Sequence, residues 1–142
     1  MEFYCIEPEV AGGHGPRTVY NLEKTPPEVL VLEYVFDDWL GDPLLESSPC
    51  FIVTRDLMEK METSGMTGIE FSEVLTSVSS EGIERMDIDL PEWMWLKPIG
   101  VASVDDFGLS GNGAVLVVSS PALELLLDSG MSNADILALP QP

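Results

Sequence analysis

Residues 51–66 constrain the fold most, because they have the pattern of a buried strand that runs directly into a capped helix. Residues 51–53 are apolar and rich in β-branched side chains, as expected of a strand covered on both faces. Thr54 then offers a side-chain oxygen to the first amides of a helix, and Gly65 supplies the left-handed residue that closes it. Three apolar residues recur at three- and four-residue spacing on one helix face: Leu57, Met58 and Met61. The stretch therefore predicts a strand-cap-helix unit.

A looser copy of this unit returns 65 residues later, over residues 117–131. A β-branched pair is followed by a hydroxyl cap in Ser119-Ser120 and by Pro121, which suits the first turn of a helix. An apolar helical face follows, and Gly130 stands where Gly65 stands in the first copy. The sequence thus predicts two similar strand-cap-helix units.

Upstream of each unit lies a further repeated motif, an apolar residue followed by two aspartates and an aromatic residue. Its first copy covers residues 36–39 and its second copy covers residues 104–107, 68 positions later. Two interpretations stay open. The chain holds an internal duplication with half-repeats at about 29–80 and 93–139, or it holds two similar units of common type.

Further strand signals lie between and around these units. The strongest is the apolar run over residues 29–36, which predicts a central strand, and residues 68–78 predict a half-exposed, bulged one. Residues 11–16 are expected to form a flexible loop, with His14 solvated. We expect the tail, residues 132–140, to lie on the surface. The predicted fold class is α+β: a single domain over residues 1–142, with a largely antiparallel sheet against which the two units pack.

Charge is the strongest compositional signal: 25 acidic residues stand against 6 basic ones, for a net charge of -19. Because 45% of the residues are hydrophobic, the chain is expected to pack a core and to carry its acids on a folded surface. A negative field of this size repels nucleic acid and anionic membranes, and it attracts a basic protein. Enhanced solubility is the other interpretation of the same charge.

The chain is expected to be cytoplasmic. Its N-terminus carries an acid where a secretory signal needs a basic leader, and no apolar run approaches the ~18 residues of a membrane span. The two cysteines, Cys5 and Cys50, do not have a metal-ligand spacing, so we expect ordinary thiols in a reducing compartment.

The sequence holds few of the residues that catalysis requires. His14 is the sole histidine, and no nucleophile elbow, zinc-binding helix or paired-cysteine motif is present. We therefore expect no enzymatic activity and no cofactor. An alternative depends on the aspartate pairs at 37–38 and 105–106, which could meet in space and hold Mg²⁺ or Ca²⁺. Local hydrogen bonding at strand ends is the other interpretation, and the one we favour.

Several short motifs resemble a family of small acidic immunity proteins from bacterial polymorphic-toxin systems. In the first half they lie at residues 38–45, including Trp-x-Gly-Asp at 39–42, and at residues 49–54 and 65–71. In the second half they lie at residues 90–97, at Asp-Asp-Phe-Gly-Leu over 105–109, and at 116–119 with Leu123. The similarity covers roughly residues 28–136. The chain departs from the family at Pro43, where a second acid is usual.

This resemblance implies a protein that binds a toxin from a neighbouring cell and blocks it without catalysis. The expected partner is the cognate toxin protein, with a basic surface, and neither nucleic acid nor membrane is expected to bind. Whether the chain is a monomer or a homodimer stays open. The candidate partner-binding residues are Asp37, Asp38, Trp39, Asp42, Trp93, Asp105, Asp106 and Phe107. Trp39, Trp93 and Phe107 are the expected anchors. Trp93 and Trp95 stand two residues apart and point to one side of an extended chain, so this pair is part of the core, the interpretation we favour, or a binding platform.

Overall fold

The computed structural model describes residues 1–86, 89–111, 113 and 115–140, which form three helices and thirteen strands. The helices are α1 (Arg55–Thr63), α2 (Ser80–Arg85) and α3 (Ser120–Asp128). The strands are β1 (Phe3–Glu7), β2 (Gly12–His14), β3 (Val19–Asn21), β4 (Glu28–Val31), β5 (Glu33–Phe36), β6 (Leu44–Ser47), β7 (Cys50–Thr54), β8 (Ile69–Glu73), β9 (Leu75–Val78), β10 (Trp93–Pro98), β11 (Phe107–Ser110), β12 (Val115–Ser119) and β13 (Asp135–Ala138). The predicted α+β class is confirmed.

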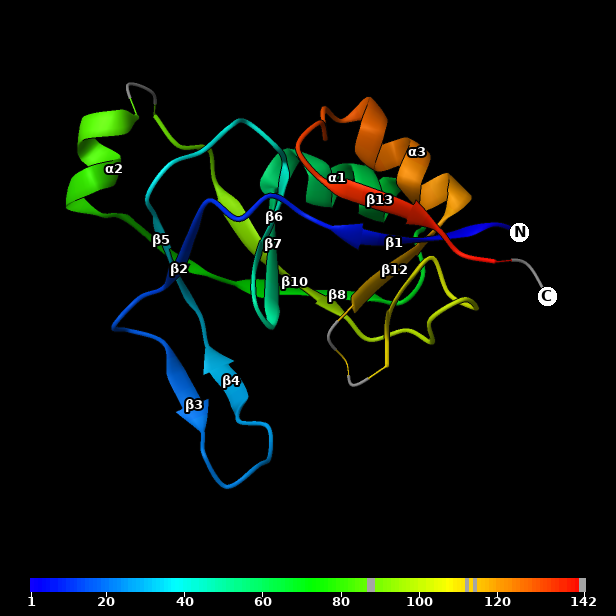
Figure 1. Ribbon diagram of the computed structural model, residues 1–142, viewed down its shortest axis with the longest axis horizontal. Coiled ribbons are helices and arrows are strands. Elements are labelled where there is room, and N and C mark those ends of the chain that lie inside the picture. Colours follow the sequence, from blue (N-terminus) through cyan, green and yellow to red (C-terminus); the bar gives the residue numbers. More distant parts are fainter. Residues whose placement is uncertain (87–88, 112, 114, 141–142) are drawn as a thin grey trace.

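The strands form four sheets (Figure 1). Two have four strands, in the orders β6-β7-β10-β8 and β11-β12-β1-β13, and both are antiparallel throughout. The third has the order β2-β5-β9, with β5 and β9 parallel, and the fourth is the β3–β4 hairpin. The expected single sheet is therefore divided, although most of its pairs are antiparallel as predicted. No helix in the described part of the chain is long and apolar enough to cross a membrane.

The sheet β6-β7-β10-β8 is called the central sheet below, and its strand β7 is buried on both faces. In β7, Phe51 and Val53 point into one hydrophobic core, while Cys50 and Ile52 point into another. The first core also contains the apolar faces of α1 and α3 together with β1 and β12. The second core lies between the central sheet and β5. This double coverage explains the uninterrupted apolar run and confirms the prediction of a strand covered on both faces.

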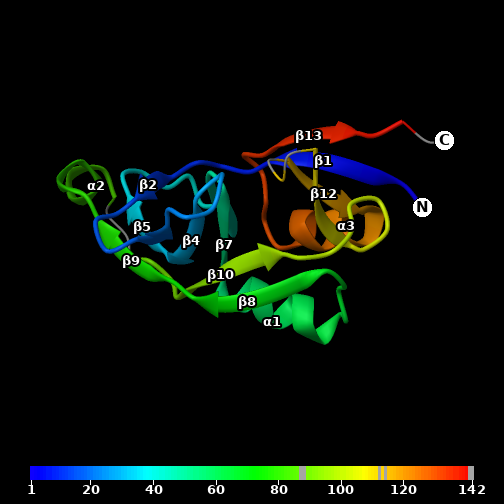
Figure 2. The ribbon, with the colours of Figure 1, turned by 90° about the horizontal axis from the view of Figure 1, so that it is seen from below.

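The two strand-cap-helix units have the predicted caps. The side chains of Thr54 and Ser119 each accept a hydrogen bond from the amide three residues further on, at 3.2 Å in both units. After the helices, Gly65 and Gly130 have positive φ angles of 67° and 104°, a conformation that favours glycine. α1 and α3 lie at the end of the molecule where both termini emerge (Figure 2).

Each unit is also preceded by a hairpin partner, so that β6-β7-α1 and β11-β12-α3 share one arrangement. The upstream aspartate pairs do not share it. Asp106 directly precedes β11, whereas Asp38 lies in the loop several residues before β6. The structure therefore shows two similar units, and an internal duplication stays a prediction.

The apolar run over residues 29–36 forms two strands instead of one. β4 belongs to the separate hairpin, and β5 lies at the centre of its own sheet, between β2 and β9. Leu32 separates the two strands and is fully buried. Similarly, residues 68–78 form two strands, β8 in the central sheet and β9 beside β5. The expected single bulged strand is therefore two strands that belong to different sheets.

The expected flexible loop over residues 11–16 contains β2, which pairs with β5. Gly12 is required by close packing, because a Cβ there would stand 1.7 Å from the carbonyl oxygen of Val35. The tail likewise forms a strand, since the exposed β13 pairs with β1 at the edge of its sheet. These segments look irregular in sequence because their hydrogen-bonding partners lie far away along the chain.

Candidate partner-binding site

The structure separates the candidate residues into two groups. One group surrounds the loop between β5 and β6 and consists of Asp37, Asp38, Trp39, Asp42 and Trp93. The other lies at the start of β11 and consists of Asp105, Asp106 and Phe107. Three of the eight side chains are buried: Asp42, Trp93 and Phe107. For these three the expectation of an accessible binding residue is wrong.

Asp42 is fully buried and joins two distant parts of the chain. One carboxylate oxygen, Oδ1, accepts hydrogen bonds from the amide of Ser132 (3.0 Å) and from Nδ2 of Asn133 (2.9 Å). The other, Oδ2, accepts from the amide of Asn133 at 2.8 Å. Asp42 therefore holds the segment that leads into β13, and its role is structural.

Glu9 holds the same loop from the N-terminal side. Its carboxylate accepts hydrogen bonds from the amides of Leu40 (2.7 Å) and Asp42 (3.2 Å). Burial raises the pKa of Glu9, and these two backbone hydrogen bonds oppose that shift. Glu9, which precedes the part of the chain that the resemblance covers, thus helps to fix the shape of the loop over residues 37–43.

Trp39 and Trp93 pack edge to face, with ring centroids 5.5 Å apart. Trp93 is 5% exposed and also packs on Phe36, at 5.4 Å, so it belongs to the second core. Its Nε1 has no hydrogen-bond partner in the structure, while Nε1 of Trp39 donates to the carbonyl oxygen of Asp42 at 2.9 Å. Trp39 alone of this pair is half-exposed and accessible to a partner.

The second group is a structural junction. Phe107 is 0% exposed in the first core. The carboxylate of Asp106 accepts hydrogen bonds from the amide of Thr67 (2.9 Å) and the hydroxyl of Ser119 (2.6 Å), and Asp105 accepts one from the amide of Val101 (2.7 Å). Burial acts to raise the pKa of Asp106, but the hydrogen bonds from Ser119 and Thr67 outweigh burial and hold this pKa below its ordinary value. Both aspartates therefore fasten loops, as local hydrogen bonding at strand ends predicted.

The alternative of a divalent-metal site finds no support in this geometry. The two aspartate pairs lie on different sheets, one after β5 and one before β11. Among the described residues, no group of three or more His, Cys, Asp and Glu side chains is arranged to hold a metal ion.

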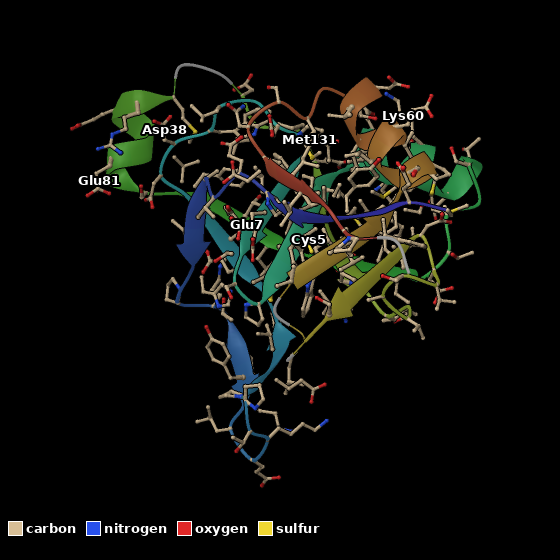
Figure 3. All side chains as sticks on the ribbon, turned by 45° about the vertical axis from the view of Figure 1, so that its right-hand side comes forward. Cys5, Glu7, Asp38, Lys60, Glu81 and Met131 are labelled. Carbon is tan, nitrogen blue, oxygen red and sulfur yellow. The ribbon has the colours of Figure 1, made fainter. Side chains whose placement is uncertain are left out.

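Asp37 and Asp38 are exposed and contribute to an acidic surface, called the acidic end below. The start of α2 packs against the end of β5, since the amide of Ser79 donates to the carbonyl oxygen of Phe36 at 3.0 Å. This contact places Glu81 and Glu84 of α2 near the aspartate pair, and Figure 3 shows Asp38 and Glu81 at the same end of the molecule. The acidic end consists of Asp37, Asp38, Glu81 and Glu84, all exposed.

A second surface is the projecting hairpin of residues 19–31, called the arm below. β3, β4 and their turn extend away from the rest of the molecule (Figure 1). Five large apolar side chains of the arm are exposed: Val19, Tyr20, Leu22, Leu30 and Val31. Its charges are largely paired, because Lys24 binds Glu28 at 2.9 Å and, at its base, Arg17 binds Glu33 at 2.9 Å.

A pocket of about 600 Å³ lies between the arm and the turn that joins β6 to β7. Its lining contains no acid or lysine or arginine side chain: His14, Tyr20, Leu22, Pro26, Pro27, Val29, Ser48, Pro49 and Gly113. His14 fixes the arm to the body, because Nε2 donates to the carbonyl oxygen of Ser47 (3.0 Å) and Nδ1 contacts the hydroxyl of Tyr20 (2.6 Å). The expectation that His14 is a solvated loop residue is therefore wrong.

Sequence reasoning overlooked this arm pocket. A signal was present, since Val19, Tyr20 and Leu22 are apolar residues that fit neither of the predicted helices nor a long strand. Their exposure depends on the direction in which the hairpin leaves β5, and no local pattern specifies that direction.

Most of the acidic surface is not compensated. In the described residues, bases lie within 4.0 Å of only four carboxylates, those of Glu28, Glu33, Glu59 and Glu92. Three acids are buried, and each of these accepts hydrogen bonds from the protein: Glu9, Glu33 and Asp42. Among the other acids that the structure describes, all but Glu46, Asp105 and Asp106 are exposed to solvent.

Comparisons with protein-family models, with curated proteins and with solved structures gave no match to this chain. The geometry of its own residues is therefore the basis for assigning a function.

Proposed function

We propose that this chain is an immunity protein that binds a bacterial toxin domain and neutralises it without turnover. The carrying observation is the large uncompensated negative charge on a folded surface: 25 acids against 6 bases, with few ion pairs among the described residues. Such a field speeds the capture of a basic protein. The resemblance of the Trp-x-Gly-Asp and Asp-Asp-Phe-Gly-Leu motifs to immunity proteins supports the choice of a toxin as that protein.

The exposed candidate residues fit this function better than a catalytic one. Asp37 and Asp38 lie on the acidic end, and Trp39 is accessible beside them. Both ring nitrogens of His14, the chain's single histidine, contact Tyr20 and Ser47, so neither is free to act as a general base. The supporting features are thus charge and accessible aromatic surface, which are properties of a binding protein.

Co-expression with the toxin encoded beside this chain's gene tests the proposal. The toxin alone should stop growth, and the chain should restore growth and co-purify with the toxin. Restored growth without co-purification would contradict direct neutralisation, and failure of both would reject the proposed function.

The role of the acidic end can be tested with the same pair of proteins. Glu81→Lys with Glu84→Lys should lower the association rate several-fold at low salt, because these charges are exposed and unpaired. The matched control places two lysines on α3 instead, as Glu124→Lys with Asp128→Lys. Stopped-flow mixing at rising salt concentration measures the association rate. As the Debye length falls from ~30 Å to ~8 Å, association of the wild-type protein should slow steeply. If the two double variants lower the association rate equally, the net charge of the whole molecule steers the partner and the acidic end has no special role.

A further inference from the structure

We propose that the arm pocket is the docking site for a large apolar side chain carried by the basic partner, an inference that rests on the proposed function. The pocket holds about 600 Å³, within the usual range for a binding cleft, and its lining is dominated by aliphatic, proline and tyrosine side chains. Contiguous exposed apolar surface of this kind marks interaction sites in monomeric proteins.

The arm and its base, residues 17–33, carry less net negative charge than the rest of the molecule. They hold three of the 25 acids and two of the 6 bases, and two ion pairs join four of these five charges. Glu23 is the one left over. A partner group that enters the arm pocket therefore needs no charge of its own, and apolar contact supplies the affinity there.

The occupant is a heterologous basic protein and not a second copy of this chain. Two copies would each bring a net charge of -19 to a shared interface, and their mutual repulsion opposes pairing. A basic protein is instead attracted to the acidic surface around the arm. Its apolar side chain is then buried where the arm offers no competing charge, which is the usual anatomy of an anchor inside a charged rim.

The base of the arm and Asp37 of the acidic end are close enough to share one interface. β5 begins at the base of the arm, where Glu33 binds Arg17, and it ends at Phe36, next to Asp37. Four strand residues span ~13 Å, whereas an interface of ~800 Å² per partner is roughly 30 Å across. The acidic end thus sets the encounter rate and the arm pocket sets the lifetime of the complex.

Leu22→Glu provides the test, since it adds an acid and removes an apolar side chain from the pocket lining. If charge alone governed binding, this variant would bind a basic toxin at least as well as wild type. If the arm pocket holds an anchor, the dissociation constant should rise tenfold or more, chiefly through a faster off-rate. Leu22 is 77% exposed, so the variant should keep its fold, and Leu22→Ala provides a milder second variant.

Leu30→Glu is the matched control. Leu30 lies on the same arm, is 52% exposed and does not line the pocket, so its variant should change the dissociation constant less than threefold. Binding to the toxin domain encoded beside this chain's gene is measured by surface plasmon resonance, and the state of the chain alone by sedimentation.

The outcomes separate the two proposals. Wild-type binding that is lost with Leu22→Glu but kept with Leu30→Glu supports the arm pocket. Wild-type binding that Leu22→Glu leaves unchanged or tightens, or that both variants weaken equally, overturns the arm pocket and leaves the proposed function standing. A homodimer that Leu22→Glu converts to monomers also overturns it, because a second copy then fills the pocket. Absence of any wild-type binding rejects both proposals.

Discussion

The central sheet and the arm use apolar residues in opposite ways. In the central sheet, neighbouring residues of β7 enter two different cores, and the four apolar side chains of this strand, over residues 50–53, are all buried. In the arm, five large apolar side chains are exposed on a two-stranded hairpin, a structure that is marginally stable alone. Ion pairing by Arg17 and the contacts of His14 hold the arm in place. The difference shows that the residues that stabilise the fold and those available for binding are separated in space, so substitutions can affect one without the other.

The largest expected effect concerns Trp93, which sequence reasoning treated as an anchor. Trp93→Ala should lower the free energy of unfolding by about 4 kcal/mol, because it leaves a cavity among Phe36 and Trp39. Trp93→Phe should cost far less, since Nε1 of Trp93 has no hydrogen-bond partner to lose. Urea unfolding measures both. A Trp93→Ala variant as stable as wild type would remove Trp93 from the core and break the comparison.

The next effect concerns Asp42. Asp42→Ala should lower the free energy of unfolding by about 3 kcal/mol, because the amides of Ser132 and Asn133 lose a charged, buried acceptor. Hydrogen exchange should show that β13 opens more readily. Asp37→Ala is the control from the same loop, and its exposed side chain predicts a change within ~0.5 kcal/mol. A loss for Asp42→Ala that also stays within ~0.5 kcal/mol would show that the buried hydrogen bonds of Asp42 do not stabilise the fold.

A smaller effect is expected from pH. Burial raises the pKa of Glu9 and of Glu46, so their proton uptake favours the folded state at low pH, and this contribution is lost as pH rises through their raised pKa values. Hydrogen bonds from Arg17 lower the pKa of Glu33, so its contribution is present above the ordinary value near 4.5 and is lost as pH falls through the lowered value.

The urea midpoint should therefore rise as the pH falls from 7 toward about 5, helped by weaker repulsion among the surface acids, and should fall again below about pH 4. Glu33→Gln should remove part of the low-pH decline. A midpoint that decreases steadily from pH 7 downward would contradict the assignment for Glu9 and Glu46.

The smallest effect is expected in the arm. Leu30→Ala should change the free energy of unfolding by no more than ~0.5 kcal/mol, because Leu30 is largely exposed. Leu45→Ala in β6 makes the matched truncation at a fully buried leucine and should cost 2–5 kcal/mol, on the order expected for core leucines. A loss above ~1.5 kcal/mol for Leu30→Ala would place the arm within the cooperative core.

Structural features that depend only on residues adjacent in the sequence could be predicted from the sequence. The caps at Thr54 and Ser119, the glycine exits and the buried strand over residues 51–53 all follow from local patterns, and the structure confirms them. β2 could not be recognised in the same way. Its glycines indicate flexibility when read alone, whereas the close approach of Val35 makes Gly12 a packing requirement.

The candidate site was harder to predict for the same reason. Asp42 was a candidate partner-binding residue in a Gly-Asp-Pro loop, and its partners Ser132 and Asn133 lie 90 and 91 residues away. Trp93 looked like either core or platform, and the position of Phe36 decides that it is core. Asp37, Asp38 and Trp39 remain candidates because they are accessible, and their role in binding is still a prediction.

The place of β1 affects how the chain can be assembled during translation. β1 is synthesised before the other described strands, but its two neighbours are β12 and β13, whose paired residues lie at positions 116–119 and 135–138. At ribosomal speeds of ~5–20 residues per second, β1 therefore waits on the order of 10 s for both partners to emerge. The nascent chain must keep an apolar N-terminal segment unpaired for that time. Its many carboxylates, which repel one another and neighbouring chains, oppose aggregation in the interval.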